Sequence, residues 1–419
     1  MKWTPTTVGT LVRMGAADIK TGPFGTQLKA SQYVDEGVPV INVRNIGLGE
    51  LKLDKLEFVG EETSERLSDH LLQNNDIVFG RKGAVDRHLF VTEQQCGWLQ
   101  GSDCIRLRFL SSSVRSRFVS YAFRLNAHQE WMLGQSANKA TMASLNHDII
   151  ERISFLLPSV DTQDRVVKVL AAYDDLIENS RRRMALLEDA ARQLFREWFV
   201  RLRFPGYEHT RIVDGVPEGW ERRPLISLCV ANGIQTGPFG SQLHQSDYSE
   251  EGVPVVMPKD LIGFRISVST IARIPEDLAE KLGRHRMVPG DIVYGRRGDI
   301  GRRAFIGNRQ NGFFCGTGSL RIRADDRQIN ARYLFDSLGA PETAGTIANR
   351  AKGATMLNLN AKILQSVPVL VAKRSLQDFY ADHVAASTEL IEVLEAQNQK
   401  LRAARDLLLP RLMSGEIAV

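Results

Sequence analysis

Apolar positions between residues 163 and 199 recur at alternating steps of three and four residues. This spacing is the heptad signature of a coiled coil, and the segment contains no Gly and no Pro. It predicts a helix of about 60 Å, which residues 204–206 (FPG) end. Ser180 occupies one expected apolar position. The remaining seam is Val166, Leu170, Tyr173, Ile177, Met184, Leu187, Ala191, Leu194 and Trp198.

A second long helix is predicted over residues 376–409, before Pro410. Its seam is weaker, because Ser387, Asn398 and Arg405 stand at expected apolar positions. A polar residue at such a position often fixes the register at a cost in stability. The other seam residues are Tyr380, Val384, Ile391, Leu394, Leu401, Leu408 and Leu412. Each apolar stripe must be buried, so we expect the two helices to pack on each other.

Shorter patterns precede the first long helix. The predicted strands are residues 37–43, 76–80, 89–91, 104–110 and 153–158, and the predicted helices are residues 8–14, 61–72 and 114–133. In residues 105–108 (IRLR) apolar and basic side chains alternate, which gives a strand one apolar and one basic face. The aromatic residues of the 114–133 segment are more typical of a core than of a base-stacking platform.

This pattern is written twice along the chain. Residues 21–25 (TGPFG) return letter for letter as residues 236–240, an offset of 215 residues. The other matches at that offset are residues 36–40 with 251–255, 76–83 with 291–298, and 105–108 with 320–323. So long a period indicates a duplicated domain and not a solenoid.

We therefore expect two similar globular α/β domains, residues 1–158 and 220–372. Each is followed by a long helix, in residues 159–203 and in residues 373–419, which include the C-terminal tail. Residues 204–219 form a linker. The fold class is α+β. A pseudo-twofold relation between the halves makes the helix pair an antiparallel coiled coil, a rod that holds the two domains apart.

Composition changes this picture little. The chain is 43% hydrophobic and 25% charged, which is ordinary for a soluble globular protein. A net charge of +5 and a pI near 9.0 permit a nucleic-acid partner without requiring one. Four scattered cysteines without a CxxC pair fit a reducing cytoplasm. No apolar run approaches 18 residues, so we expect a cytoplasmic protein without membrane contact.

No convincing catalytic set appears. The sequence lacks a Walker-type phosphate loop, an HExxH motif and the tetrapeptides of an amino-methyltransferase, and residues 316–318 (GTG) follow no dinucleotide-binding pattern. Residues 76–82 loosely resemble a metal-dependent nuclease strand, but no companion carboxylate is spaced to match. A structural strand followed by a basic turn is the simpler interpretation. We expect no catalytic residue, metal site or bound cofactor.

The basic turns are the better lead to function. Arginine and lysine pair with phosphates and with guanine O6 and N7, although a solvated surface turn would look the same. Both copies are basic although their letters differ, which favours a function in nucleic-acid binding. The residues are Arg81, Lys82 and Arg87 in copy one, and Arg296, Arg297, Arg302 and Arg303 in copy two.

Further candidates flank the shared segments. The TGPFG turn itself is copied letter for letter, which favours a structural role, whereas its neighbours differ between copies and are residue types that read bases. These neighbours are Lys20, Gln27 and Lys29, against Gln242 and His244. After the next strand stand Arg44 and Asn45, against Lys259. Lys139 and Lys352 belong to a repeated turn that could hold a phosphate, cap a helix or join domains.

Two further segments complete the pattern, residues 192–199 (RQLFREWF) and residues 407–417 (LLLPRLMSGEI), at the ends of the long helices. Together with the paired TGPFG, DIV[FY]GR[KR]G and ATM…LN segments, they resemble the specificity subunit of type I restriction-modification systems. The resemblance covers essentially the whole chain. The two helix-end segments are its most specific part.

This resemblance implies a non-catalytic subunit. Each globular copy would be a target recognition domain that reads one half of a split, asymmetric sequence in double-stranded DNA. The two helices would be the spacer that sets the gap between the half-sites. Two modification subunits would bring S-adenosylmethionine and methylate adenine. In a complex that also cleaves, two restriction subunits would bring ATP and Mg²⁺. These cofactors are therefore expected on partner subunits and none on this chain.

One departure and two alternatives remain. Many members carry a Pro-Pro…Glu-Gln run before the long helix. Here that run is residues 157–163 (LPSVDTQ) in copy one and fades to residues 372–377 (AKRSLQ) in copy two, so the second docking surface is less well defined.

The chain could also be a stand-alone nuclease with duplicated active sites or a protein-binding coiled-coil scaffold. Cleavage of DNA with Mg²⁺ would favour the nuclease, and absence of salt-dependent DNA binding would favour the scaffold.

Overall fold

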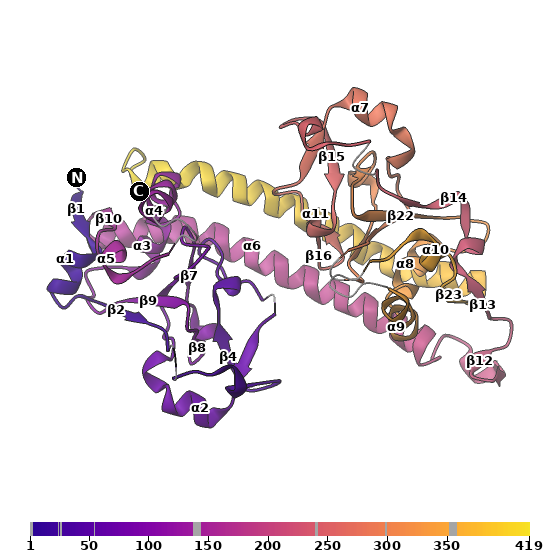
Figure 1. Ribbon diagram of the computed structural model, residues 1–419, viewed down its shortest axis with the longest axis horizontal. Helices are drawn as coiled ribbons and strands as arrows, with labels where there is room; N and C mark the ends of the chain where they lie inside the picture. The colour runs from indigo at the N-terminus through magenta and orange to yellow at the C-terminus, as the bar shows by residue number, and fades with distance from the viewer. Residues whose placement is uncertain are drawn as a thin grey trace. The chain divides into compact units, whose positions relative to one another are not determined.

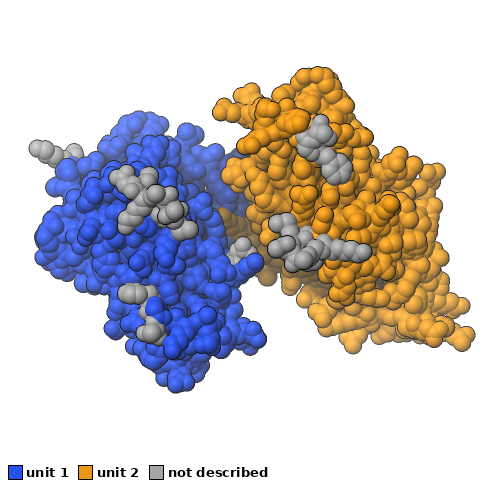
Figure 2. All heavy atoms as spheres, viewed as in Figure 1, with its two compact units in different colours: residues 1–179, 397–419 blue, residues 180–396 orange. Residues whose placement is uncertain are grey.

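The computed structural model describes residues 3–23, 25, 27–53, 55–136, 144–238, 242–297, 300–351 and 358–419. The chain divides into two compact units, residues 1–179 with 397–419 (unit 1) and residues 180–396 (unit 2), coloured separately in Figure 2. We name the globular parts of the two units head 1 (residues 3–158) and head 2 (residues 220–372). Each unit also contains a part of both long helices, which Figure 1 shows in full.

Head 1 contains two four-stranded sheets. The first consists of β2 (Ala17–Thr21), β9 (Cys104–Phe109), β6 (Ile77–Gly80) and β7 (His88–Phe90), in this spatial order and all antiparallel. The second consists of β3 (Tyr33–Val34), β5 (Glu57–Val59), β4 (Val38–Ile41) and β8 (Leu99–Gln100), of which β4 and β8 are parallel. A separate antiparallel pair, β1 (Thr4–Thr7) and β10 (Ser154–Leu157), joins the start of the head to its end.

Head 2 repeats the first sheet and part of the second. Its four-stranded sheet consists of β14 (Cys229–Thr236), β22 (Ser319–Ala324), β19 (Asp291–Gly295) and β20 (Arg303–Phe305), again antiparallel and in this order. The other strands are β18 (Ala272–Ile274), β15 (Val253–Val256) and β21 (Phe314–Cys315), and the pair β13 (Glu221–Pro224) with β23 (Pro368–Val371). Two hairpins are β16 (Leu261–Ile262) with β17 (Arg265–Ile266), and β11 (Ile212–Val213) with β12 (Val216–Pro217) in the linker.

The duplication extends to the strand register. In head 1, Thr21 pairs with Ile105, and in head 2 the equivalent Thr236 pairs with Leu320. Both faces of β9 are covered, because the basic face packs within the protein and Arg106 is only 4% exposed. The alternation in residues 105–108 therefore serves ion pairing inside the head.

Short helices cover the sheets. They are α1 (Val8–Arg13), α2 (Glu61–Arg66), α3 (Ser116–Ala122), α4 (Asn126–Ser136) and α5 (His147–Glu151) in head 1, and α7 (Glu276–Lys281), α8 (Ala331–Ser337), α9 (Pro341–Arg350) and α10 (Ala361–Gln365) in head 2. The prediction of a single helix over residues 114–133 is wrong, since α3 and α4 are separate. Tyr121 and Arg124 at this break both bond one oxygen of Asp174, at 2.8 and 3.0 Å. In head 2 the equivalent break carries Gly339 and Pro341.

The two long helices are α6 (Val160–Phe195), which continues as one π-helical turn (Arg196–Val200), and α11 (Arg374–Met413). α11 extends one turn beyond its predicted end and includes Pro410. The buried seam residues are Val166, Leu170, Ile177, Ser180, Met184, Ala191 and Trp198 of the first helix, and Tyr380, Val384, Leu394, Asn398 and Leu412 of the second. The half-buried seam residues are Tyr173, Leu187, Leu194, Ile391, Leu401 and Leu408.

Within unit 1, α6 and the end of α11 run antiparallel. Asp174 accepts a hydrogen bond from Arg405 at 2.6 Å, and the Ile177 carbonyl accepts one from the Asn398 side chain at 3.4 Å. The higher-numbered of the two α6 residues contacts the lower-numbered of the two α11 residues, so the helices run antiparallel. Two of the three polar seam residues of α11 therefore make specific contacts with α6 rather than facing water.

Within unit 2, the same two helices are antiparallel and pack through aromatic side chains. Trp198 stacks on Phe379 with ring centroids 5.6 Å apart and an interplanar angle of 14°. The Tyr380 hydroxyl contacts the Ala191 carbonyl at 3.4 Å and donates to Asp336 of head 2 at 2.8 Å. This cluster joins both helices to the head.

A buried glutamine joins each head to the long helix that follows it. Gln163 is fully buried, accepts the Arg115 N–H at 2.8 Å and donates to the Pro158 carbonyl at 2.9 Å. Gln377 does the same in head 2, accepting the Asn330 N–H at 2.9 Å and donating to a backbone carbonyl at 2.7 Å. The faded sequence run in copy two therefore still forms the same junction.

Asp174 gives unit 1 a testable pH dependence. Burial raises the pKa of Asp174, but Arg124, Arg405 and Tyr121 together hold that pKa below its ordinary value of 3.8. A carboxyl whose pKa is lower in the folded than in the unfolded state stabilises the fold above the unfolded pKa. That stabilisation is lost as the pH falls through the folded pKa.

We expect Arg405→Met to lower the free energy of unfolding by about 1–3 kcal/mol at pH 7 and to shift acid unfolding to higher pH. Circular dichroism during urea and acid titrations measures both effects. Arg411→Met is the matched control, since Arg411 forms an exposed pair with Glu416. Equal behaviour of the two variants would contradict the role assigned to Asp174.

Candidate nucleic-acid interface

Candidate segments of head 1 meet at residues 101–103, which precede β9 and which we name the hub loop. The Gly101 N–H bonds the Ile41 carbonyl at 2.9 Å, just before the polar stretch that follows β4. The Asp103 carbonyl accepts the Arg81 N–H at 2.7 Å. The hub loop thus holds the stretch after β4 and the basic turn after β6 by backbone hydrogen bonds.

The TGPFG turn is the third segment at this loop. The Gly22 N–H bonds the Cys104 carbonyl at 2.9 Å. A Cβ atom on Gly22 would lie 1.9 Å from the Gly101 carbonyl oxygen, and one on Gly101 would lie 2.5 Å from the Ile41 carbonyl oxygen. No side chain fits at either glycine, so the turn and the hub loop approach closely only because both positions lack one.

Head 2 repeats this arrangement with residues 316–318 as its hub loop. Gly316 donates to the Val256 carbonyl at 3.0 Å, and the Gly318 carbonyl accepts the Arg296 N–H at 2.8 Å. A Cβ on Gly237 would lie 2.0 Å from the Gly316 carbonyl oxygen. The three candidate segments are therefore brought together in each head by the same backbone contacts.

The repeated turn before α5 and α10 ends at the same place. Leu145 and Leu359 each donate a backbone hydrogen bond, at 2.8 and 2.9 Å, to the carbonyl of the first arginine in the basic turn. Asn146 and Asn360 cap the helices that follow, each accepting a backbone N–H at 2.9 Å. The candidates Lys139 and Lys352 lie outside the described residues.

Cationic candidates of head 1 lie beside carboxylates. The pairs are Lys20–Asp69 at 3.2 Å, Arg44–Glu57 at 3.3 Å, Lys82–Asp103 at 3.2 Å and Arg87–Asp86 at 3.9 Å. Gln27 and Lys29 are exposed, and Arg81 is half-buried. Exposed pairs of this kind contribute about 0–1 kcal/mol, so a phosphate can replace the carboxylate at little cost.

The described candidates of head 2 other than Arg303 are exposed or half-buried. His244, Lys259 and Arg297 are exposed, and Gln242, Arg296 and Arg302 are half-buried. Arg296 donates to the Asn358 side chain at 3.2 Å. Burial and the neighbouring charge of Arg297 lower the pKa of Arg296. A bound anion would relieve the repulsion between these two guanidinium groups.

Two of the sequence candidates are structural residues. Asn45 is fully buried, and its side chain accepts the Asn42 N–H at 3.0 Å inside the loop. Arg303 is 7% exposed, donates to the Phe335 carbonyl at 3.1 Å, and lies over the Phe264 and Phe335 rings at 4.8 and 5.0 Å. Both side chains are buried among protein partners, which argues against DNA contact by either residue.

Gly101 and Gly316 are positions that the sequence motifs did not single out. Both stand at the offset of 215 residues, so the duplication contained the signal. As a dinucleotide-binding signal, the GxG of residues 316–318 is weak. Their use here is to permit close backbone approach.

The aspartates of the nuclease-like strands, Asp76 and Asp291, are paired with arginines. Asp76 is fully buried and receives two hydrogen bonds from Arg108, at 2.6 and 2.7 Å. Asp291 receives two from Arg323, both at 2.7 Å. In the described ranges no group of three or more His, Cys, Asp or Glu side chains is placed to hold a metal ion. Both aspartates therefore tie neighbouring strands together.

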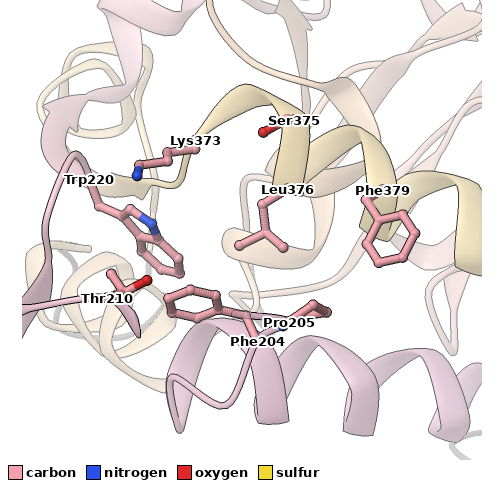
Figure 3. Close-up of a pocket in the computed structure, with 8 residues that line it drawn as sticks. All are labelled: Phe204, Pro205, Thr210, Trp220, Lys373, Ser375, Leu376 and Phe379. Carbon is pink, nitrogen blue, oxygen red and sulfur yellow. The ribbon is translucent and has the colours of Figure 1, made fainter. Parts of the chain in front are cut away.

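A cleft of about 390 Å³ lies in unit 2 where the linker meets the start of α11 (Figure 3). The Phe204 and Trp220 rings, 5.0 Å apart, form one wall. The other lining residues are Pro205, Thr210, Lys373, Ser375, Leu376 and Phe379. None of the sequence candidates for DNA contact lines this cleft.

Comparison with known proteins gives the class. Residues 18–189 match the family described as "Type I restriction modification DNA specificity domain". The chain is 23% identical over 315 residues to the type I restriction enzyme MjaIX specificity subunit of Methanocaldococcus jannaschii, covering 73% of this chain and 70% of that protein. It is 21% identical over 357 residues to the MjaVIII specificity subunit of the same organism, covering 83% and 80%.

A solved structure has the same fold. The S subunit of a type I restriction-modification system from M. genitalium superposes with a TM-score of 0.53 at 15% identity, covering 98% of this chain and 96% of that one. Residues 18–189 thus match the type I DNA specificity domain, and the chain as a whole is similar to the specificity subunits of type I restriction-modification systems. Within the described part of the chain, no helix is both long and apolar enough to cross a membrane.

The hub contact predicts an asymmetric response to glycine substitution. We expect Gly22→Ala to lower the free energy of unfolding by about 1–3 kcal/mol or more, because the new methyl group would collide with the backbone carbonyl of Gly101. Gly134→Ala is the control, since Gly134 lies in α4 with open space around it, and alanine there should add about 0.5–1 kcal/mol. Thermal unfolding measures both. A neutral Gly22→Ala variant would contradict the hub contact.

Proposed function

We propose that this chain is the DNA-recognition subunit of a type I restriction-modification complex and that it reads a bipartite, asymmetric target, one head per half-site. The observation that carries the proposal is the hub of each head, which presents different side chains on the same backbone frame. The candidate readers that differ between the heads are Lys29 and Arg44 in head 1, against His244 and Lys259 in head 2, and the equivalent Gln27 and Gln242 are glutamine in both.

These residue types match base edges. Glutamine pairs with adenine N6 and N7, and arginine or lysine pairs with guanine O6 and N7. The frame is fixed by backbone hydrogen bonds and by glycines that are the same in both heads. The side chains can therefore differ without disturbing the fold, and two different half-sequences are the expected consequence.

The long helices are the proposed scaffold. Both run from unit 1 into unit 2, and each exposes apolar side chains away from the seam. Leu176 and Leu186 of α6 are 50% and 71% exposed, and Val393 and Leu407 of α11 are 46% and 74% exposed. We assign these faces to two modification subunits that bring S-adenosylmethionine. Restriction subunits, where present, bring ATP and Mg²⁺.

Methylome sequencing of cells that express the chain with its modification subunit tests the proposal. We expect methylated adenines in a single motif made of two different half-sequences separated by a fixed number of unspecified bases. Replacing Lys29 and Arg44 together should change the half-sequence read by head 1 and leave the other half unchanged. A contiguous or perfectly palindromic motif would contradict the assignment of one half-site to each head.

A further inference from the structure

The two heads differ in charge around a buried arginine beside the TGPFG turn. Arg106 in β9 and Arg321 in β22 are equivalent at the 215 offset, and they are 4% and 6% exposed. Each is paired across the sheet with the residue just before the turn, Lys20 in head 1 and Gln235 in head 2. Their surroundings can be compared position by position.

In head 1 the charges cancel. Arg106 donates to Asp18 at 2.5 Å, and Lys20 lies 3.2 Å from Asp69. Two cations therefore face two carboxylates. The Asp69 side chain is 85% exposed.

In head 2 both carboxylates are absent. Gly233 stands in place of Asp18, Gln235 in place of Lys20, and Arg284 in place of Asp69. Arg321 donates to neutral oxygens, the Arg284 carbonyl at 2.9 Å, and the Asn232 carbonyl and the Gln235 side chain at 3.2 Å each. Two cations face no carboxylate, and in the described part of head 2 neither arginine has an ion pair.

Nearby acids do not supply the missing charge. Asp291 is within electrostatic range of Arg321 but holds Arg323 through both oxygens. Burial lowers the pKa of Arg321, and burial with the charges of Arg284 and Arg321 lowers the pKa of His285 to about 4. His285 is therefore neutral at pH 7, and the positive field comes from the two arginines. Such a buried, unpaired charge is costly unless an anion compensates it.

Arg284 is placed to meet that anion. It is exposed in the middle of the short turn Gly283–His285, and its guanidinium donates to the Gln242 side chain at 3.1 Å. Gln242 follows the TGPFG turn closely and is a candidate base reader. The arginine therefore lies beside the proposed DNA surface of head 2.

We propose that Arg284, with Arg321 behind it, binds one backbone phosphate of the DNA in the half-site of head 2, and that head 1 lacks this contact because Asp18 and Asp69 neutralise the equivalent place. This inference rests on the proposed function. It predicts that the two heads contribute unequally to the salt dependence of DNA binding.

The test measures the dissociation constant of the complete complex, chain plus modification subunit, for a duplex carrying the motif found by methylome sequencing. Arg284→Gln should weaken binding about tenfold and reduce the slope of log K against log salt by about one, the contribution of one phosphate. The methylated sequence should stay the same. Arg327→Gln, at an 87% exposed arginine elsewhere in head 2, is the control and should change neither quantity.

Exchange variants make the test independent of a single substitution. Gln235→Lys with Arg284→Asp installs the ion pair of head 1 in head 2 and should reproduce the loss. Asp18→Gly with Lys20→Gln and Asp69→Arg opens the equivalent place in head 1 and should steepen the salt slope. Duplexes with one neutral methylphosphonate at a time locate the contact. One position should weaken wild-type binding and leave Arg284→Gln unaffected.

The outcomes separate the two proposals. If the wild-type complex binds its motif and Arg284→Gln behaves like Arg327→Gln, the phosphate contact is wrong and the proposed function stands. A methylphosphonate effect that persists in Arg284→Gln at every position also overturns the contact. If the wild-type complex shows no salt-dependent binding to DNA, the proposed function itself fails.

Discussion

The arrangement of each head depends on one close contact between two backbones. The TGPFG turn and the hub loop approach so closely that a Cβ on Gly22 or on Gly237 would lie 1.9 or 2.0 Å from a carbonyl oxygen of the opposite segment. Only glycine permits this distance. The contact fixes where the turn, the stretch after β4 or β15 and the basic turn lie relative to one another. Because it involves no side chains, it leaves the neighbouring side chains free to differ.

A second constraint acts on the long helices. Polar groups in the seam are costly unless they find partners, and here Arg405 and Asn398 contact Asp174 and the Ile177 carbonyl. Such contacts favour one antiparallel register over its slipped alternatives. In unit 2 the Trp198 and Phe379 stack serves the same purpose with aromatic packing. The helices and heads are therefore specified by different physical means within one chain.

Much of the fold followed from the sequence because the signals were local or repeated. Heptad spacing predicts α6 and α11, and β-branched runs predict strands β4, β6 and β9. The break between α3 and α4 contains no Gly or Pro, so the local sequence does not predict it. At this break Tyr121 and Arg124 bond Asp174 of α6, which is distant in sequence. The equivalent break in head 2 does carry Gly339 and Pro341. The second copy therefore carries the sequence signal for a break that the first copy lacks.

The sequence predicted which segments form the candidate site, but it predicted less well which residues in those segments are exposed. All the described segments meet at the hubs, yet Asn45 and Arg303 are buried. Burial there is decided by partners remote in sequence, as when Phe264 and Phe335 enclose Arg303. Arg284 lies outside every segment that the two copies share letter for letter. Its signal is the change from an acid to a base between copies, and a search for identical letters does not detect a charge reversal.

The central claim is that each head, on the same backbone hub, independently reads its own half-sequence. Replacing head 2 (residues 220–372) by a second copy of residues 1–158, with both long helices and the linker retained, tests it most directly. Methylome sequencing of cells carrying this chimaera and the modification subunit should reveal a motif whose two half-sequences are the same. Persistence of the original second half-sequence would contradict the claim.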